Sequence, residues 1–110
     1  MLLQIYFEIE PDKSAEFEQM YQNEYVPAMQ KQVGYEGSRL LRLFSADLIR
    51  ETQARETSFN YQMELVFDCE ENRRKWADSE EHKKVWPAAQ NLAKQVAWRG
   101  YDVAGKDRLG

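Results

Sequence analysis

The chain has 110 residues, of which 43% are hydrophobic, 13% aromatic and 31% charged, and its formal net charge is -4. This length suits a single domain, and the apolar content is enough for a folded core, so the composition excludes an intrinsically disordered chain. The negative charge argues against nucleic acid as a partner, because the densest basic run, Arg73–Lys75, is bracketed by Glu70, Glu71 and Asp78. We therefore expect one domain over residues 1–110.

The first predicted element is a strand over residues 3–9, because apolar and mostly polar side chains alternate there with a period of two. Pro11 ends this strand, and Asp12 or Ser14 can cap the helix that follows. Apolar residues then recur at three- and four-residue steps over residues 17–29, which is typical of an amphipathic helix.

Pro27 lies inside this helical stripe. It has no amide proton, and its ring clashes with the carbonyl of Asn23 one turn earlier. We therefore expect the helix to kink between Asn23 and Val26, or to begin a second segment there. Gly34 and Gly37 then mark the end of the helical region.

The middle of the chain predicts two strands separated by a charged segment. Ser38–Phe44 is the second expected strand, and alternation over residues 61–67 predicts the third. The segment between them, Ser45–Ser58, shows little alternation and much charge. We expect it to be an exposed connection, either a mobile loop or an extension of the flanking hairpin.

A second helical region and a last strand complete the pattern. Asp68 followed by Glu71 resembles a capping box, which predicts a helix start there. This region is expected to run to about Ala93, with a break where Ser79 provides a fresh N-cap. A short strand, Ala97–Val103, is expected to follow.

The resulting order, βαββαβ, is that of an α+β ferredoxin-like domain, a four-stranded antiparallel sheet with two helices on one face. Odd-numbered positions of the strands at 3–9 and 61–67 are nearly all apolar, so they should face the helices. The other face would carry Gln4, Tyr6, Glu8, Gln62, Glu64 and Val66, with Arg39 or Arg42 from the second strand. Such a face can lie in water, or two copies can stack theirs into a closed α/β barrel that also covers sheet edges.

No window approaches the ~20 apolar residues of a membrane span, and Gln4 and Glu8 already interrupt the first segment. We therefore expect neither a membrane partner nor an export signal. The single cysteine, Cys69, cannot form an internal disulfide, which suits the reducing cytoplasm. One histidine and one cysteine leave no ligand cluster, so we expect no metal.

Four stretches carry a resemblance to a known family: Pro11-Asp12-Lys13 after the opening strand, Tyr25-Val26-Pro27-Ala28-Met29 followed by Gly34, Trp76-Ala77-Asp78-Ser79-Glu80-Glu81-His82, and the closing Tyr101-Asp102-Val103-Ala104-Gly105. Together they resemble the dimeric α/β-barrel superfamily, and within it the antibiotic biosynthesis monooxygenase-like group, related to EthD- and NIPSNAP-type domains. The resemblance implies a homodimer with a cavity in each subunit between sheet and helices. Members include cofactor-independent oxygenases of polycyclic phenols, haem-degrading enzymes and many proteins without assigned activity, so fold analogy does not select the reaction.

His82 is the candidate general base, because it is the only side chain whose unperturbed pKa lies near neutrality. The charged residues on either side of it, 80–81 and 83–84, favour a solvent-facing histidine instead. Trp76 and Trp86 can form a flat wall for an aromatic substrate, or they can simply pack in the core. Both interpretations remain open for each of these residues.

Tyrosines and an arginine complete the candidate site. Tyrosine hydroxyls can orient a phenol, and Arg39 or Arg42 can stabilise a developing phenolate. We predict catalytic roles for His82, Tyr25 and Arg39. We predict substrate contacts for Trp76, Trp86, Tyr21, Tyr61 and Tyr101.

Two functions remain open at this point. The first is a cofactor-independent monooxygenase that acts on an aromatic or polyketide-like compound. The second is a non-catalytic dimeric module that binds a ligand or serves a structural role. Haem breakdown in the superfamily uses a helical histidine about ten residues after the motif tryptophan, and this chain has Trp86 at that spacing. That departure argues against haem.

Overall fold

The computed structural model describes residues 1–108, which contain four strands and five α-helices. The strands are β1 (Leu2–Ile9), β2 (Tyr35–Arg42), β3 (Tyr61–Phe67) and β4 (Ala93–Tyr101). The helices are α1 (Ser14–Met20), α2 (Val26–Gln30), α3 (Ala46–Glu51), α4 (Glu70–Ala77) and α5 (Glu80–Gln90). None of the helices in this part of the chain is long and apolar enough to span a membrane.

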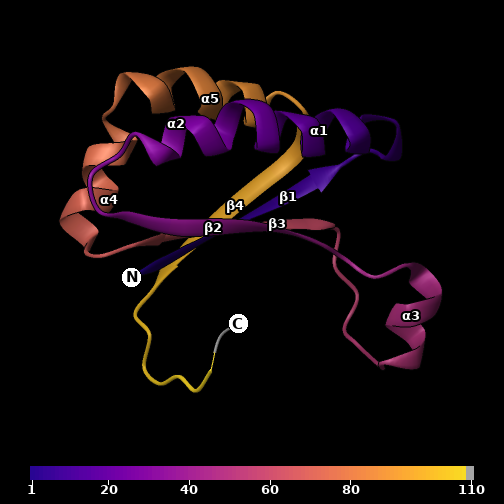
Figure 1. Ribbon diagram of the computed structural model, residues 1–110. Helices are drawn as coiled ribbons and strands as arrows, with labels where there is room; N and C mark the ends of the chain where they lie inside the picture. Colours follow the sequence, from indigo (N-terminus) through magenta and orange to yellow (C-terminus); the bar gives the residue numbers. More distant parts are fainter. Residues whose placement is uncertain (109–110) are drawn as a thin grey trace.

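The strands form one antiparallel sheet in the order β2-β3-β1-β4. Figure 1 shows α1, α2 and α5 lying across one face of this sheet, with α4 at one end. Within residues 1–108, the opposite face carries no helix of the main body, and α3 and the segment that follows β4 extend on that side. The arrangement confirms the expected α+β ferredoxin-like fold with its helices on one face.

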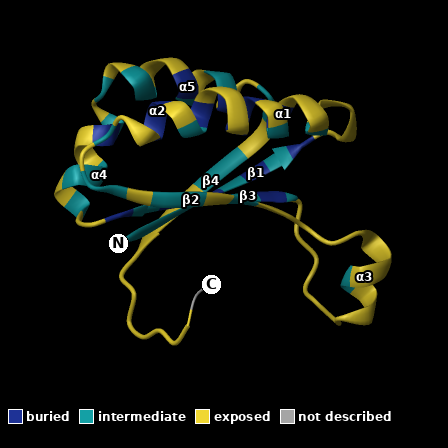
Figure 2. Cartoon of the chain, in the orientation of Figure 1, coloured by how far each residue is buried: buried dark blue, intermediate teal, exposed yellow. Residues whose placement is uncertain are grey.

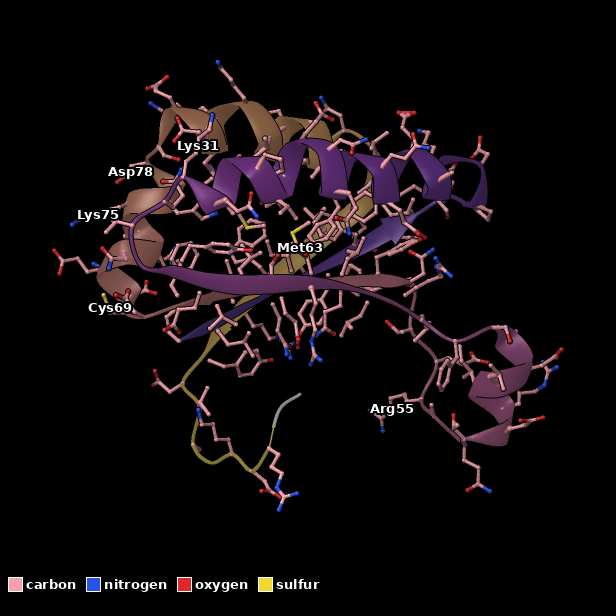
Figure 3. The ribbon with its side chains drawn as sticks, viewed as in Figure 1. Lys31, Arg55, Met63, Cys69, Lys75 and Asp78 are labelled. Carbon is pink, nitrogen blue, oxygen red and sulfur yellow. The ribbon has the colours of Figure 1, made fainter. Side chains whose placement is uncertain are left out.

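The core lies between the sheet and the helices. Ile5 and Phe7 of β1 and Met63 and Leu65 of β3 are buried, as their odd-numbered positions predict. Phe17 of α1 packs on Phe7 with ring centroids 4.9 Å apart. Met63 is visible between the two layers in Figure 3, and buried positions in Figure 2 follow the inner sides of the helices.

The two arginines of β2 lie on opposite faces of the sheet. Arg39 is in register with Glu64 and forms an ion pair with it on the open face. Arg42 is in register with Tyr61 and donates two hydrogen bonds to Glu18 of α1, of 2.9 and 2.8 Å. The open face therefore carries Arg39, one of the two residues that the strand pattern allowed.

The distortion expected from Pro27 lies just before the proline and is a π-helical turn. A π-helical turn, Tyr21–Tyr25, separates α1 from α2, and Pro27 is in the first turn of α2. A proline is tolerated there because the first amide groups of a helix have no acceptor in that helix. The expected second segment is thus present, and the wider turn before it carries the distortion.

Three local predictions need correction. The segment predicted as an exposed connection contains α3, which Ser45 caps by accepting a hydrogen bond from the amide of Leu48 at 3.4 Å. The N-cap of α4 is Cys69 without a side-chain cap bond, and Asp68 instead accepts from the Asn72 side chain at 2.8 Å. The last strand begins at Ala93, four residues before its predicted start, and α5 ends at Gln90. Ala89, Leu92 and Val96 also fit helical spacing, so the pattern alone did not separate helix from strand.

Candidate functional site

A cavity of about 180 Å³ lies between the helices and one half of the sheet. Its lining comes from β1, β4, the π-helical turn, α4 and α5. The lining residues are Leu3, Ile5, Tyr25, Arg73, Trp76, Ala77, His82, Trp86 and Trp98. The chain has three tryptophans, and all of them are in this list.

Ser79 organises the junction between α4 and α5. Its hydroxyl donates to the carbonyl of Trp76 at 2.7 Å and accepts from the backbone amide of His82 at 3.1 Å. The Trp-x-x-Ser-x-x-His pattern is therefore a helix stop followed by an N-cap. As a result, the rings of Trp76 and His82 meet edge to face, with centroids 4.9 Å apart.

The imidazole of His82 lies between two indoles. It is perpendicular to Trp76, at 87°, and nearly parallel to Trp86, at 9° with centroids 6.2 Å apart. The residue is half-buried and lines the cavity, so its ring is partly shielded from solvent. Burial lowers its pKa, and the positive charge of Arg73 lowers it further. His82 is consequently neutral at pH 7 and has a lone pair available for a proton.

Tyr25 is fully buried at the inner side of the cavity. Its ring meets Trp76 edge on, with centroids 5.8 Å apart and an interplanar angle of 68°. Among the described residues, its hydroxyl is the only buried side-chain oxygen or nitrogen without a hydrogen-bond partner. Burial raises the pKa of this phenol well above its usual range, so Tyr25 stays protonated and remains a donor.

Arg73 supplies the positive charge in the lining. Its guanidinium is held by the carboxylate of Glu70, one turn earlier on α4, through two hydrogen bonds. The side chain is 25% exposed, so the charge is partly shielded from water. The cavity therefore combines an apolar wall, a neutral imidazole, a buried phenol and one cation.

Four of the predicted site residues lie elsewhere. Tyr21 is hydrogen-bonded to Ser38 at 2.6 Å, and Tyr61 donates to Glu18. Arg39 and Tyr101 lie on the open face of the sheet, paired with Glu64 and close to the hydroxyl of Tyr6 respectively. The structure brings His82, Tyr25, Trp76 and Trp86 together, and any role of the other four lies outside this cavity.

The sequence interpretation missed Arg73 and Trp98. Trp98 is in register with Ile5, so it shares the helix side of the sheet, and it meets Trp86 at 90° with centroids 5.8 Å apart. Val96 and Trp98 are two residues apart and therefore share one face of a strand, which was a usable signal. The strand was predicted to begin only at Ala97, so Val96 was left out of it. Arg73 carried no such signal, because it belongs to a run of three basic residues on an exposed-looking helix.

The described part of the chain offers no clustered ligands for a metal ion. Residues 1–108 hold no group of three or more histidine, cysteine, aspartate or glutamate side chains placed to bind an ion. Cys69 is free and exposed at the start of α4, away from the cavity lining.

No family model matches the sequence, and no curated protein matches it either. Solved structures do match. A dimeric ferredoxin-like protein of unknown function from Jannaschia sp. CCS1 has a TM-score of 0.71 at 9% identity and covers 93% of this chain and 97% of its own. An EthD family protein from Bacillus halodurans has a TM-score of 0.64 at 18% identity, covering 93% and 99%. SnoaB, a cofactor-independent oxygenase from Streptomyces nogalater, has a TM-score of 0.62 at 14% identity, covering 94% and 95%.

These identities are too low to carry function, and they establish the fold alone. The likeness extends over nearly the full length of both chains in each case. The comparisons thus confirm the ferredoxin-like fold that the resemblance implies.

Proposed function

We propose that this protein is a homodimeric α/β-barrel protein that binds a small aromatic compound in the tryptophan-lined cavity and oxidises it with dioxygen, without a cofactor. One observation carries the proposal: a neutral imidazole faces an apolar cavity walled by three indoles. Aromatic walls favour flat aromatic ligands through stacked and edge-on contacts. The imidazole supplies a proton acceptor where such a ligand would lie.

The volume of the cavity indicates the size of the ligand. An apolar cavity of about 150 Å³ holds benzene. At a packing density of ~0.74, a cavity of about 180 Å³ accommodates ligand atoms of roughly 130 Å³. This volume suits a compound of one or two fused rings.

The chemistry requires a substrate with an acidic C–H group next to a phenol or ketone. His82 takes the proton, and Arg73 stabilises the negative charge left on the substrate oxygen. The carbanion then gives one electron to dioxygen, and the two radicals combine into a peroxide. His82 returns its proton to the peroxide, which then loses water and leaves a carbonyl, so a CH₂ group and O₂ become C=O and H₂O.

The oxygenase class draws support from the SnoaB structure, whose fold this chain shares over nearly its full length. At 14% identity that structure supports the class of reaction only as a proposal. The alternative is a module that binds the same kind of ligand without chemistry. Such a module would bind its ligand in the same cavity but would not convert it to a product.

The open face of the sheet supports the homodimer. Leu41, at 37% exposure, and Leu43, at 40%, continue along this side of β2 into the segment that holds α3. A second copy would cover these side chains and the neighbouring polar network of Gln4, Arg39 and Glu64. Two structures that match this fold are described as dimeric ferredoxin-like proteins. The free thiol of Cys69 suits the reducing cytoplasm as the place where this dimer works.

Oxygen uptake and tryptophan fluorescence test the function together. We expect fluorescence quenching by members of a panel of hydroxylated one- and two-ring aromatics, and consumption of one O₂ per molecule for a quenching compound with an acidic C–H group. His82→Gln should keep binding and lower the rate by about 100-fold or more. Lys84→Ala, an exposed change on the same helix, serves as the control.

Each outcome of that experiment is informative. Quenching without oxygen uptake by any bound compound would favour the non-catalytic ligand-binding module. A rate unchanged in His82→Gln would remove the proposed base. No quenching by any compound would contradict the cavity as a binding site.

A further inference from the structure

The hydroxyl of Tyr25 is a buried donor that nothing in the described protein satisfies. Buried polar groups in folded proteins are nearly always hydrogen-bonded, because desolvation without a partner is costly. Phenylalanine would fill the same space without that cost. A phenol at this position therefore points to a partner that is not part of the folded chain.

The surroundings show where that partner would lie. Tyr25 is the last residue of the π-helical turn and lines the cavity together with Leu3, Ile5 and Trp76. The side chains of Leu3 and Ile5 are apolar and the indole of Trp76 offers only a donor, so none of the three can accept a hydrogen bond from the hydroxyl. Single π-helical turns often occur at functional sites, where they redirect a side chain.

The polarity of the group restricts the partner further. The hydroxyl remains protonated because burial disfavours the phenolate, so it acts as a donor and not as a base. A carbonyl or phenolate oxygen accepts such a bond, whereas a hydrocarbon edge does not. His82 provides a lone pair in the same lining, but no hydrogen bond joins it to the hydroxyl of Tyr25.

We propose that Tyr25 is a specificity-determining residue that donates a hydrogen bond to a ring oxygen of the ligand, so that the cavity selects aromatic ketones and phenolates over aromatic hydrocarbons. This inference rests on the proposed function, because it concerns the same cavity. It adds the chemical class of the ligand: one or two fused rings that carry an acceptor oxygen at the inner end.

The test compares two ligands of nearly equal shape, 1-indanone and indane, by calorimetry and tryptophan fluorescence. We expect the wild-type protein to bind 1-indanone about tenfold more tightly, the worth of one buried hydrogen bond. In Tyr25→Phe this preference should vanish while indane binds as before. Tyr21→Phe is the matched control, since the hydroxyl of Tyr21 is bonded to Ser38 and should not affect the preference.

The failures are distinguishable. Equal binding of both ligands to the wild type, or a preference that survives Tyr25→Phe, would overturn the role of Tyr25 and leave the aromatic cavity standing. Binding of neither ligand would contradict the proposed function, and the inference about Tyr25 would fall with it. Binding of indane by Tyr25→Phe also shows that this variant is folded.

Discussion

At the scale of single residues, Tyr25 offers a test of stability that needs no ligand. Its unpaired hydroxyl destabilises the free protein, so Tyr25→Phe should raise the free energy of unfolding by about 1–3 kcal/mol. Tyr21→Phe should lower it by about 1 kcal/mol, because that hydroxyl is bonded to Ser38. Urea unfolding measures both. A loss of stability in Tyr25→Phe would mean that the hydroxyl has a partner within the protein.

His82 predicts a pH dependence of stability. Its pKa is lowered in the folded protein, by burial first and by Arg73 second, and Asp78 opposes this weakly. The unfolded chain therefore binds a proton near pH 6.5 that the folded chain binds only at lower pH. Stability should fall as pH drops through 6.5 and level off below the folded pKa.

The size of this effect is bounded. One proton gives at most about 1.4 kcal/mol per pH unit, and a half-exposed ring gives less. Between pH 7.5 and 5.5, the free energy of unfolding measured with urea should fall more for wild type than for His82→Gln. An equal fall in both proteins would show that the pKa of His82 is the same in the folded and the unfolded chain.

The residue scale also shows what sequence can and cannot predict. The position of His82 was readable, because 82, 85, 86 and 89 follow helical spacing on one face of α5, where Val85 and Ala89 are buried. The charged neighbours in sequence were misleading, since adjacent residues on a helix point in different directions. The place of Arg73 in the lining depends on tertiary packing, which a linear pattern does not encode. Strand alternation, by contrast, already allowed Arg39 on the face opposite the helices.

At the scale of elements, Ser79 joins two helices and positions two site residues. Ser79→Ala removes both of its hydrogen bonds, to the Trp76 carbonyl and from the His82 amide. We expect a loss of about 1 kcal/mol in the free energy of unfolding, the usual cost of an N-cap. It should also weaken binding of 1-indanone, because the rings of Trp76 and His82 lose their support.

Ser79→Thr is the control, because a threonine hydroxyl can cap in the same way. Thermal unfolding and calorimetry follow the two variants. A Ser79→Ala protein that is as stable as wild type, with unchanged affinity, would show that the junction is held by packing alone.

Long periodic segments made the elements predictable, and short ones did not. The alternation in β1 and β3 fixed both the strands and their buried faces. The six-residue helix α3 has no apolar stripe long enough to distinguish it from a loop. The π-helical turn followed from Pro27 only as a distortion of unspecified kind, because a proline excludes one hydrogen bond without selecting what replaces it.

At the scale of the whole molecule, the open sheet face predicts the assembly. Light scattering should give about twice the chain mass of 13.1 kDa at micromolar concentration. Leu41→Arg should shift the protein to 13.1 kDa, since an unpaired charge would be buried at the interface. Val33→Arg, at an exposed turn between α2 and β2, is the control and should stay dimeric. A wild-type monomer at 13.1 kDa would contradict the dimer.

The segment that carries α3 extends away from the body on the open side of the sheet (Figure 1), and Figure 2 shows it as largely exposed. Arg55 lies at this extension in Figure 3. The α3 segment and residues 102–108 lie at the border of the face that a second copy would cover. The sequence could predict the polar and aromatic character of this face, but not the shape of its rim.

The most direct test of the central claim is a proton–nitrogen spectrum of the three indole groups during titration with 1-indanone. All three tryptophans line the cavity, so each indole reports on it. We expect the signals of Trp76, Trp86 and Trp98 to shift together and to saturate with a single dissociation constant. Indole signals that stay unchanged at millimolar ligand would contradict an aromatic-binding cavity between the sheet and its helices.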